Sequence, residues 1–239
     1  MVNALVRAIL LALPALLVFG CTGFVSPPIT YWNGESEKML RKNAIEVSTR
    51  ASEVGSAPSA FTGNVSLGYG LDSTFEIHVD PTYHQYFSEL DCDGYGTEVH
   101  VKVSSPNMKN EALLVGAGYE HSPVEDALTL EFGGVTGDRF WVIGAGISGA
   151  LYASIPLRSK AMPFDDYAWL FSDNYLTERK LFIKGFDPTI GIYFSPYLVL
   201  YLEDFFELGV NVIVGAAKSS SSFTMLGGLG ASVKIRIFN

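Results

Sequence analysis

The sequence is poor in cysteine and in basic residues. It has two cysteines, Cys21 and Cys92, among 239 residues. Two cysteines exclude the disulfide framework of many small secreted domains. Lysine and arginine total 16 against 25 acidic residues, so the formal net charge is −9. An acidic chain with scattered basic residues lacks the electrostatic footprint of a nucleic-acid-binding protein, so no nucleic-acid partner is expected.

The N-terminus has no apolar run long enough to be a membrane-spanning helix. The apolar run that follows Arg7 covers residues 8–19. A helix needs about 20 apolar residues to cross a bilayer, whereas the apolar part of a signal peptide has about 7 to 15. We therefore predict a signal peptide over residues 1–20. Its removal takes Arg7 away and changes the formal net charge from −9 to −10.

The end of this segment carries a processing pattern formed by Val18, Phe19, Gly20 and Cys21. These residues resemble the lipobox of bacterial lipoproteins, although Phe19 is bulkier than that pattern prefers. The resemblance implies a diacylglycerol on the Cys21 sulfur and a third acyl chain on its amine, and two or more chains anchor a protein stably. Thr22 after the cysteine implies sorting to the outer membrane.

Two consequences of this resemblance concern the cysteines. Lipidation of Cys21 would leave Cys92 with no disulfide partner inside the chain. The alternative is ordinary cleavage near Gly20, which would leave Cys21 unmodified.

Residues 21–60 are expected to form a lipidated tether before the main domain. Prolines lie near both of its ends, and residues 36–51 combine helix-forming and apolar residues, so a short helix is expected there. A linker and a plug fit this stretch equally well.

From Phe61 onward the hydrophobic pattern has a period of two, which indicates strands with two unlike faces. Turn signals such as residues 105–107, 122–123, 133–138, 186–188, 195–196 and 219–222 separate the runs. Consecutive hairpins of this kind predict an all-β domain over residues 61–239, an antiparallel up-and-down β-barrel of about 8–12 strands.

The second face of several strands is small or charged, which favours a barrel that lies in a membrane. Gly144, Gly146 and Ser148 alternate with bulky apolar residues. The chain thus resembles small outer-membrane β-barrels, with bulky residues facing lipid. Charged side chains must then face the lumen, because Arg or Lys in the lipid midplane costs ~2–4 kcal/mol. This assigns to the lumen or its rims Glu76, Glu98, Lys102, Glu131, Lys234 and Arg236.

Aromatic residues near expected strand ends are the candidates for the two interfacial girdles of such a barrel. They are Tyr167, Trp169, Phe171, Tyr193, Phe194, Tyr197, Phe205 and Phe206. One departure is that Phe238 is out of phase with the expected lipid-facing set Val233, Ile235 and Ile237, whereas small outer-membrane barrels commonly end on an aromatic residue in phase. The alternative is a lipid-tethered soluble β-barrel or sandwich that binds a small apolar ligand in its mouth.

A GxGxxG pattern at residues 144–149 is similar to the start of a dinucleotide-binding domain. That fingerprint needs a following helix, which Pro156 interrupts, and a βαβ context that is absent. We interpret these glycines as a small barrel face and expect no cofactor.

Two further groups of residues could indicate a metal site and a hydrolase active site. The polar residues of 78–93 are interpreted as an exposed acidic loop rather than a cation site; they are His78, Asp80, His84, Glu89, Asp91 and Asp93. His121 and Ser122 are neighbours, but adjacent strand residues point to opposite faces, and no acid is expected to orient the histidine. We therefore expect no catalytic residue and no metal ligand.

The sequence predicts an outer-membrane lipoprotein with a structural or pore-like β-barrel and no catalysis. Membrane lipid is its expected partner through Cys21. No protein partner is predicted.

Overall fold

The structure is a computed structural model. The residues that it describes are 26, 28, 32, 35, 36, 38–55, 60–86, 92–104, 110–159, 162–163, 182–183, 186–203, 205–220 and 223–237. The predicted signal peptide and Cys21 lie outside the described residues. Within the described ranges, no helix is long and apolar enough to cross a membrane.

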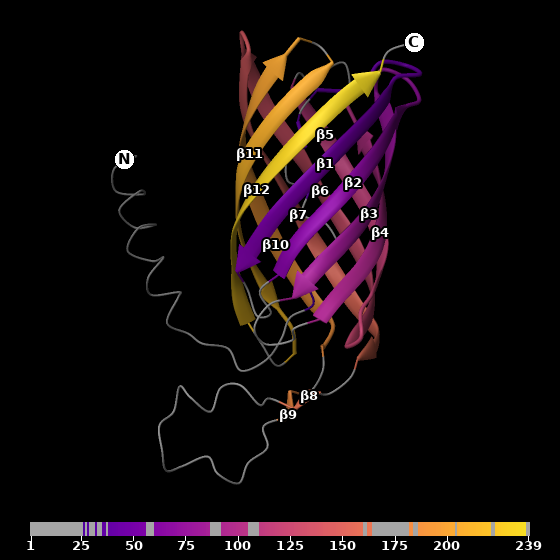
Figure 1. Ribbon diagram of the computed structural model, residues 1–239, viewed down its shortest axis with the longest axis vertical. Helices are drawn as coiled ribbons and strands as arrows, with labels where there is room; N and C mark the ends of the chain where they lie inside the picture. The colour runs from indigo at the N-terminus through magenta and orange to yellow at the C-terminus, as the bar shows by residue number, and fades with distance from the viewer. Residues whose placement is uncertain are drawn as a thin grey trace, which may run out of the picture.

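Ten antiparallel strands close into a single barrel (Figure 1), which confirms the predicted all-β fold class and strand number. The barrel order is β1-β12-β11-β10-β7-β6-β5-β4-β3-β2, so successive barrel strands pair with one another and β1 closes the barrel against β12. The strands are β1 (Ile45–Gly55), β2 (Ala60–Gly70), β3 (Phe75–Tyr86), β4 (Cys92–Val103), β5 (Glu111–His121), β6 (Glu125–Phe140), β7 (Ile143–Ser159), β10 (Thr189–Leu202), β11 (Phe206–Lys218) and β12 (Phe223–Ile237). A separate two-stranded sheet, β8 (Met162–Pro163) with β9 (Phe182–Ile183), lies between β7 and β10 in the chain.

The barrel begins at Ile45, earlier than the boundary at residue 61. Residues 45–55 form β1, which pairs with β2 on one side and closes the barrel against β12 on the other. The expected helix over residues 36–51 is therefore wrong for its second half, and no described residue of its first half is helical. Ile45, Val47 and Thr49 point out while Glu46, Ser48 and Arg50 point in, so a strand pattern was present in the sequence.

Two turn predictions are also wrong. Residues 195–196 lie inside β10, and residues 133–138 lie inside β6. The turn after β6 is formed by Trp141 and Val142, and Trp141 has a φ of 59°, a left-handed conformation that a two-residue hairpin turn requires. The turn after β2 is held by Asp72, whose carboxylate accepts hydrogen bonds of 2.7 Å from the Thr74 hydroxyl and amide, which lower the Asp72 pKa.

The connections define two unlike rims. The short-turn rim has the connections 71–74, 104–110, 141–142 and 203–205, together with the start of β1 and the end of β12. The long-loop rim has the connections 56–59, 87–91, 122–124, 160–188 and 219–222. Figure 1 shows the C-terminus at one rim and the β8–β9 sheet beyond the other.

The outer face of the barrel is apolar around its circumference. Leu130 and Phe132 on β6 have 55% and 57% of their surface exposed. Similar exposed residues lie on the other strands, including Leu67, Val79, Val99, Val115, Leu151, Leu198, Val210 and Val233. A water-soluble protein buries such side chains, whereas a barrel in hydrocarbon must expose them.

The inner face is polar, as predicted. The six charged residues assigned to the lumen are all buried: Glu76, Glu98, Lys102, Glu131, Lys234 and Arg236. An apolar exterior around a charged interior is the arrangement of a membrane-spanning barrel and the reverse of a soluble one.

Two of the GxGxxG glycines, Gly144 and Gly146, lie beneath tyrosine rings on the inner face, whereas Gly149 is in phase with the outward residues Ile147 and Leu151. A Cβ atom at Gly144 would lie 2.6 Å from the Tyr201 ring, and one at Gly146 would lie 2.3 Å from the Tyr197 hydroxyl and from the Thr136 carbonyl oxygen. These glycines therefore make room for bulky lumen residues of the adjacent strand β10. The interpretation as a small barrel face is therefore confirmed for Gly144 and Gly146 and is wrong for Gly149.

The girdle prediction fails for two of its aromatic residues. Tyr193 and Tyr197 point into the lumen and are at most 3% exposed. Phe194 and Phe205 do point outward. The predicted girdle residues Tyr167, Trp169 and Phe171 lie outside the described residues.

Candidate functional site: the occupied lumen

Described residues that precede β1 in the chain lie inside the barrel. We call the described residues of the range 26–44 the plug segment. Its described residues Ser26, Trp32, Glu35 and Ser36 have no surface exposed to solvent. A barrel of about eight strands is just filled by its own side chains, so a ten-stranded barrel has room for more. The plug segment occupies that room. Of the two alternatives for the tether, a linker and a plug, the structure therefore favours the plug.

At the long-loop rim, Ser26 is fixed by the first residue of β10 and by its partner on β7. The Ser26 amide donates to Thr189 Oγ1 at 3.1 Å, and the hydroxyls of Ser26 and Ser154 are 2.6 Å apart. Thr189 and Ser154 are themselves a cross-strand pair. Because Thr189 begins β10, Ser26 lies close to the end of the barrel.

In the middle of the lumen, Trp32 spans opposite walls. Its indole nitrogen donates to Glu98 Oε1 on β4 at 2.8 Å, and its amide donates to the Tyr193 hydroxyl on β10 at 3.0 Å. The Ser148 hydroxyl on β7 donates to the Trp32 carbonyl at 2.8 Å. Trp32 is therefore hydrogen-bonded to three strands.

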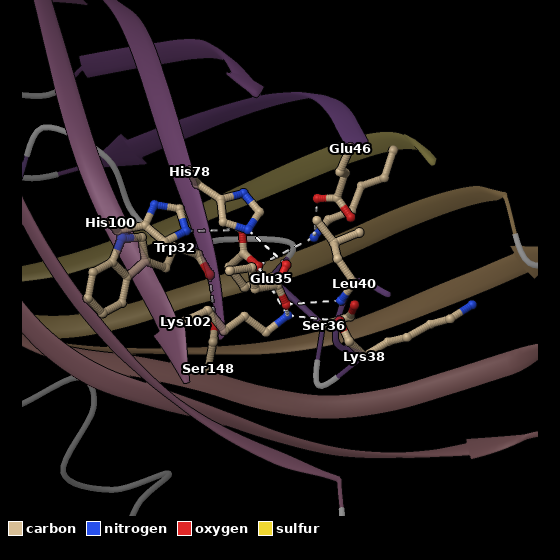
Figure 2. Close-up of polar contacts among 12 residues, drawn as sticks. Trp32, Glu35, Ser36, Lys38, Leu40, Glu46, His78, His100, Lys102 and Ser148 are labelled. Carbon is tan, nitrogen blue, oxygen red and sulfur yellow. Dashed lines mark hydrogen bonds and ion pairs between the residues drawn. The ribbon is translucent and has the colours of Figure 1, made fainter. Parts of the chain in front are cut away.

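Glu35 is the centre of a buried charge cluster (Figure 2). Its carboxylate accepts a hydrogen bond from the Arg50 guanidinium on β1. Its other oxygen lies 3.5 Å from Lys234 Nζ on β12 and 3.9 Å from Lys102 Nζ on β4. All four side chains are at most 2% exposed. One carboxylate of the plug segment thus serves as counter-ion to three cations on three strands.

Toward the short-turn rim the plug segment is held by its backbone. Lys102 Nζ donates to the Lys38 carbonyl at 2.9 Å, and the Leu40 amide donates to Glu76 Oε1 at 3.2 Å. A Cβ at Gly70 would lie 2.2 Å from the Arg41 carbonyl oxygen, so this close approach requires glycine. The contacts from Ser26 to Arg41 thus follow the lumen from one rim to the other.

The wall strands add ion pairs of their own. Arg236 on β12 donates to Glu46 on β1 at 2.9 Å and to Glu207 on β11. Lys234 Nζ is 3.5 Å from Glu46 Oε1. Glu207 also accepts from the Ser36 hydroxyl at 3.4 Å. These pairs neutralise charges that would be costly in a dry interior, and they lie where the barrel closes.

Glu35, His78 and His100 could form a metal site, because their ligand atoms lie within 4.8 Å of one another. His100 Nδ1 is 2.6 Å from Asp80 Oδ2, the kind of support that metal-binding histidines have. However, Glu35 already contacts three cations, and His78 Nε2 is 3.0 Å from Glu76 Oε2. A metal cation would have to share that carboxylate with three positive charges. We therefore assign Glu35 to ion pairing.

The interpretation of residues 78–93 as an exposed loop is wrong for three of its residues. His78, Asp80 and His84 lie on β3 and face the lumen, each at most 1% exposed. They alternate with outward residues such as Val79, so the period-two pattern continued through them. Asp93 is exposed on β4, while Glu89 and Asp91 lie outside the described residues.

His121 does have an acidic neighbour, contrary to the expectation. Its Nδ1 lies 2.5 Å from Asp126 Oδ1 across the β5–β6 turn. Ser122, however, accepts a hydrogen bond from the Glu125 amide at 2.9 Å and donates to the Glu125 carbonyl at 3.1 Å. This hydroxyl closes the turn, so the three residues do not form a nucleophile with its base.

Comparison with known proteins gives a similarity of fold. No protein-family model matches the chain, and no curated protein sequence matches it. The N-terminal β-barrel domain of Pseudomonas aeruginosa OprF is 11% identical and covers 82% of this chain and 100% of that chain, with a TM-score of 0.32. Acinetobacter baumannii Omp33 is 12% identical over 82% and 99%, with a TM-score of 0.33. Neisserial surface protein A is 11% identical over 80% and 95%, with a TM-score of 0.32. The placement of this barrel in a membrane rests on its own two faces.

Proposed function

We propose that the protein is an outer-membrane β-barrel lipoprotein, anchored through Cys21, with a structural role and a lumen closed by its own plug segment. The observation that carries this proposal is the contact of Glu35 with Arg50, Lys102 and Lys234 inside a barrel whose outer face is apolar. A polar, ion-paired interior inside an apolar exterior supports the proposal of a membrane protein.

The filling of the lumen by side chains argues for a closed barrel rather than an open pore. Trp32, Tyr193, Tyr197 and Tyr201 fill the interior with side chains that are at most 3% exposed. The plug segment adds hydrogen bonds to several strands along its length. An open pore would need wall residues in contact with water, so conduction would require this segment to leave.

The alternative of a soluble barrel that binds an apolar ligand receives less support. Its ligand site would be an apolar cavity with a few polar groups. The lumen instead holds buried Glu35, His100, Lys102 and Lys234. The apolar residues are on the outside.

Conductance across a planar bilayer tests the proposal. The full-length protein should give no steady ion channel, whereas deletion of residues 26–40 should produce one. A milder variant that replaces Trp32 with Ala and Glu35 with Gln should give brief openings if the deletion does not fold. Steady conductance by the unaltered protein would overturn the closed-lumen proposal, as would a folded deletion variant that stays closed.

Lipidation of Cys21 has a separate test. Cells that express the protein with labelled fatty acid should yield a labelled product, and Cys21→Ser should yield an unlabelled precursor. Cys92→Ser is the matched control and should remain labelled. Label that persists in Cys21→Ser would refute the site.

A further inference from the structure

The direction of the plug segment has a consequence for the N-terminus. Its contacts run in order from Ser26 at the first residue of β10, through Trp32 and Glu35, to Leu40 beside Glu76 at the start of β3. Thr189 and Glu76 lie near opposite rims. At ~3.4 Å per residue and a tilt of about 40°, the length of β10 corresponds to about 35 Å between the rims. Residues 26–44 can span roughly 60 Å when extended, so they are long enough to cross.

The two ends of the described chain therefore lie at opposite rims. The barrel's last strand, β12, ends at Ile237 at the short-turn rim, where it pairs with Ile45 at the start of β1. Ser26 lies at the long-loop rim. In Figure 1 the C-terminus likewise lies at the end opposite β8 and β9.

The loop lengths orient these rims across an outer membrane. Outer-membrane barrels have short turns on the periplasmic side and longer loops on the external side. The four connections of the short-turn rim, of which 104–110 is the longest, have at most seven residues, whereas 160–188 at the other rim has 29. The long-loop rim is accordingly the external one.

We infer that the N-terminal segment passes through the barrel lumen and places the lipid of Cys21 in the outer leaflet, on the external face of the membrane. This inference rests on the proposed lipidation. Four residues lie between Cys21 and Ser26, and the five Cα–Cα steps reach at most about 18 Å, so the acyl chains remain close to the external rim. The barrel and the lipid would then fix both ends of the plug segment, which keeps Glu35 among its cations.

Access of an antibody to the two ends tests the inference. The full chain receives a short epitope after Thr22 in one variant and after Asn239 in another. On intact cells, antibody should detect the epitope after Thr22, and it should detect the epitope after Asn239 only once the outer membrane is permeabilised. Detection of both epitopes under the same condition, or of the C-terminal one alone on intact cells, would overturn the inference.

Fatty-acid labelling of the same tagged proteins separates the two proposals. If the protein is labelled but its N-terminal epitope is hidden on intact cells, the proposed lipidation stands and the passage through the lumen is refuted. If the protein is unlabelled but its N-terminal epitope is exposed on intact cells, the passage through the lumen stands and the placement of the lipid is refuted. A boiling-dependent shift in gel mobility, which should match that of the untagged protein, verifies that each tagged barrel has folded.

Discussion

Glu35 and Arg50 form an ion pair in which both side chains are at most 1% exposed, although one belongs to the plug segment and the other to the barrel wall. Arg50 Nε and Nη1 make no hydrogen bond among the described residues, so Glu35 provides the bond that the guanidinium has there. Since Glu35 also contacts Lys102 and Lys234, this pair joins the plug segment to the walls.

Glu35→Ala should lower the free energy of unfolding by about 3–5 kcal/mol, because it leaves Arg50 buried without its counter-ion. Urea titration of the barrel in lipid vesicles measures the change. Glu53→Ala on the exposed face of β1 is the matched control and should change stability by less than about 0.5 kcal/mol. Replacing Arg50 by Met in the Glu35→Ala background should recover part of the loss, since no unpaired charge remains. If the destabilisations of Glu35→Ala and Arg50→Met simply added in the double variant, the two residues would not be paired.

Leu130→Arg should destabilise the barrel by ~2–4 kcal/mol in vesicles, because it places a charge toward lipid near the middle of β6. Leu71→Arg makes the same change at an exposed residue of the β2–β3 turn and should have little effect. Unfolding titrations compare the two variants. If Leu130→Arg proved neutral, the outer face of β6 would be in contact with water rather than with hydrocarbon.

Gly146→Ala should cost about 1–3 kcal/mol, because its new methyl group would meet the Thr136 backbone oxygen and the Tyr197 ring. Gly227→Ala is a matched control on β12, where an added Cβ has no neighbour within 4 Å. This control should be neutral or slightly stabilising, since it reduces the freedom of the unfolded chain. Equal effects at both positions would show that the Gly146 site has more space than the structure gives it.

The sequence allowed the faces of the wall strands to be predicted because alternation determines them locally. Glu98 and Lys102 could be placed in the lumen from their neighbours Val99 and Val101 alone. The same rule applied to β1 and to His78, but charged residues in those stretches were interpreted as tether or loop. A charged residue in period with a strand's inner face was the signal that was missed.

The course of the plug segment could not be predicted from the sequence. Its contacts join residues far apart in the chain, as Trp32 does with Glu98 and Tyr193. The pattern of residues 36–51 favoured a helix, and nothing in residues 26–44 indicated such partners. Their position depends on the room left inside a ten-stranded barrel and on the buried cations Arg50, Lys102 and Lys234, which come together only when the barrel closes.

The most direct test of the account is a cross-link between the plug segment and the barrel wall. Ser26→Cys and Ser154→Cys, in a Cys92→Ser background, place two thiols where the hydroxyls are 2.6 Å apart. Oxidation by copper phenanthroline of the protein in vesicles should produce a disulfide between these positions, seen by mass spectrometry of the digested protein. The control pair Ser26→Cys with Ser48→Cys, near the opposite rim on β1, should not cross-link. Failure of the first pair to form in a folded barrel, or equal cross-linking of both pairs, would contradict a lumen occupied by the chain's own N-terminal segment.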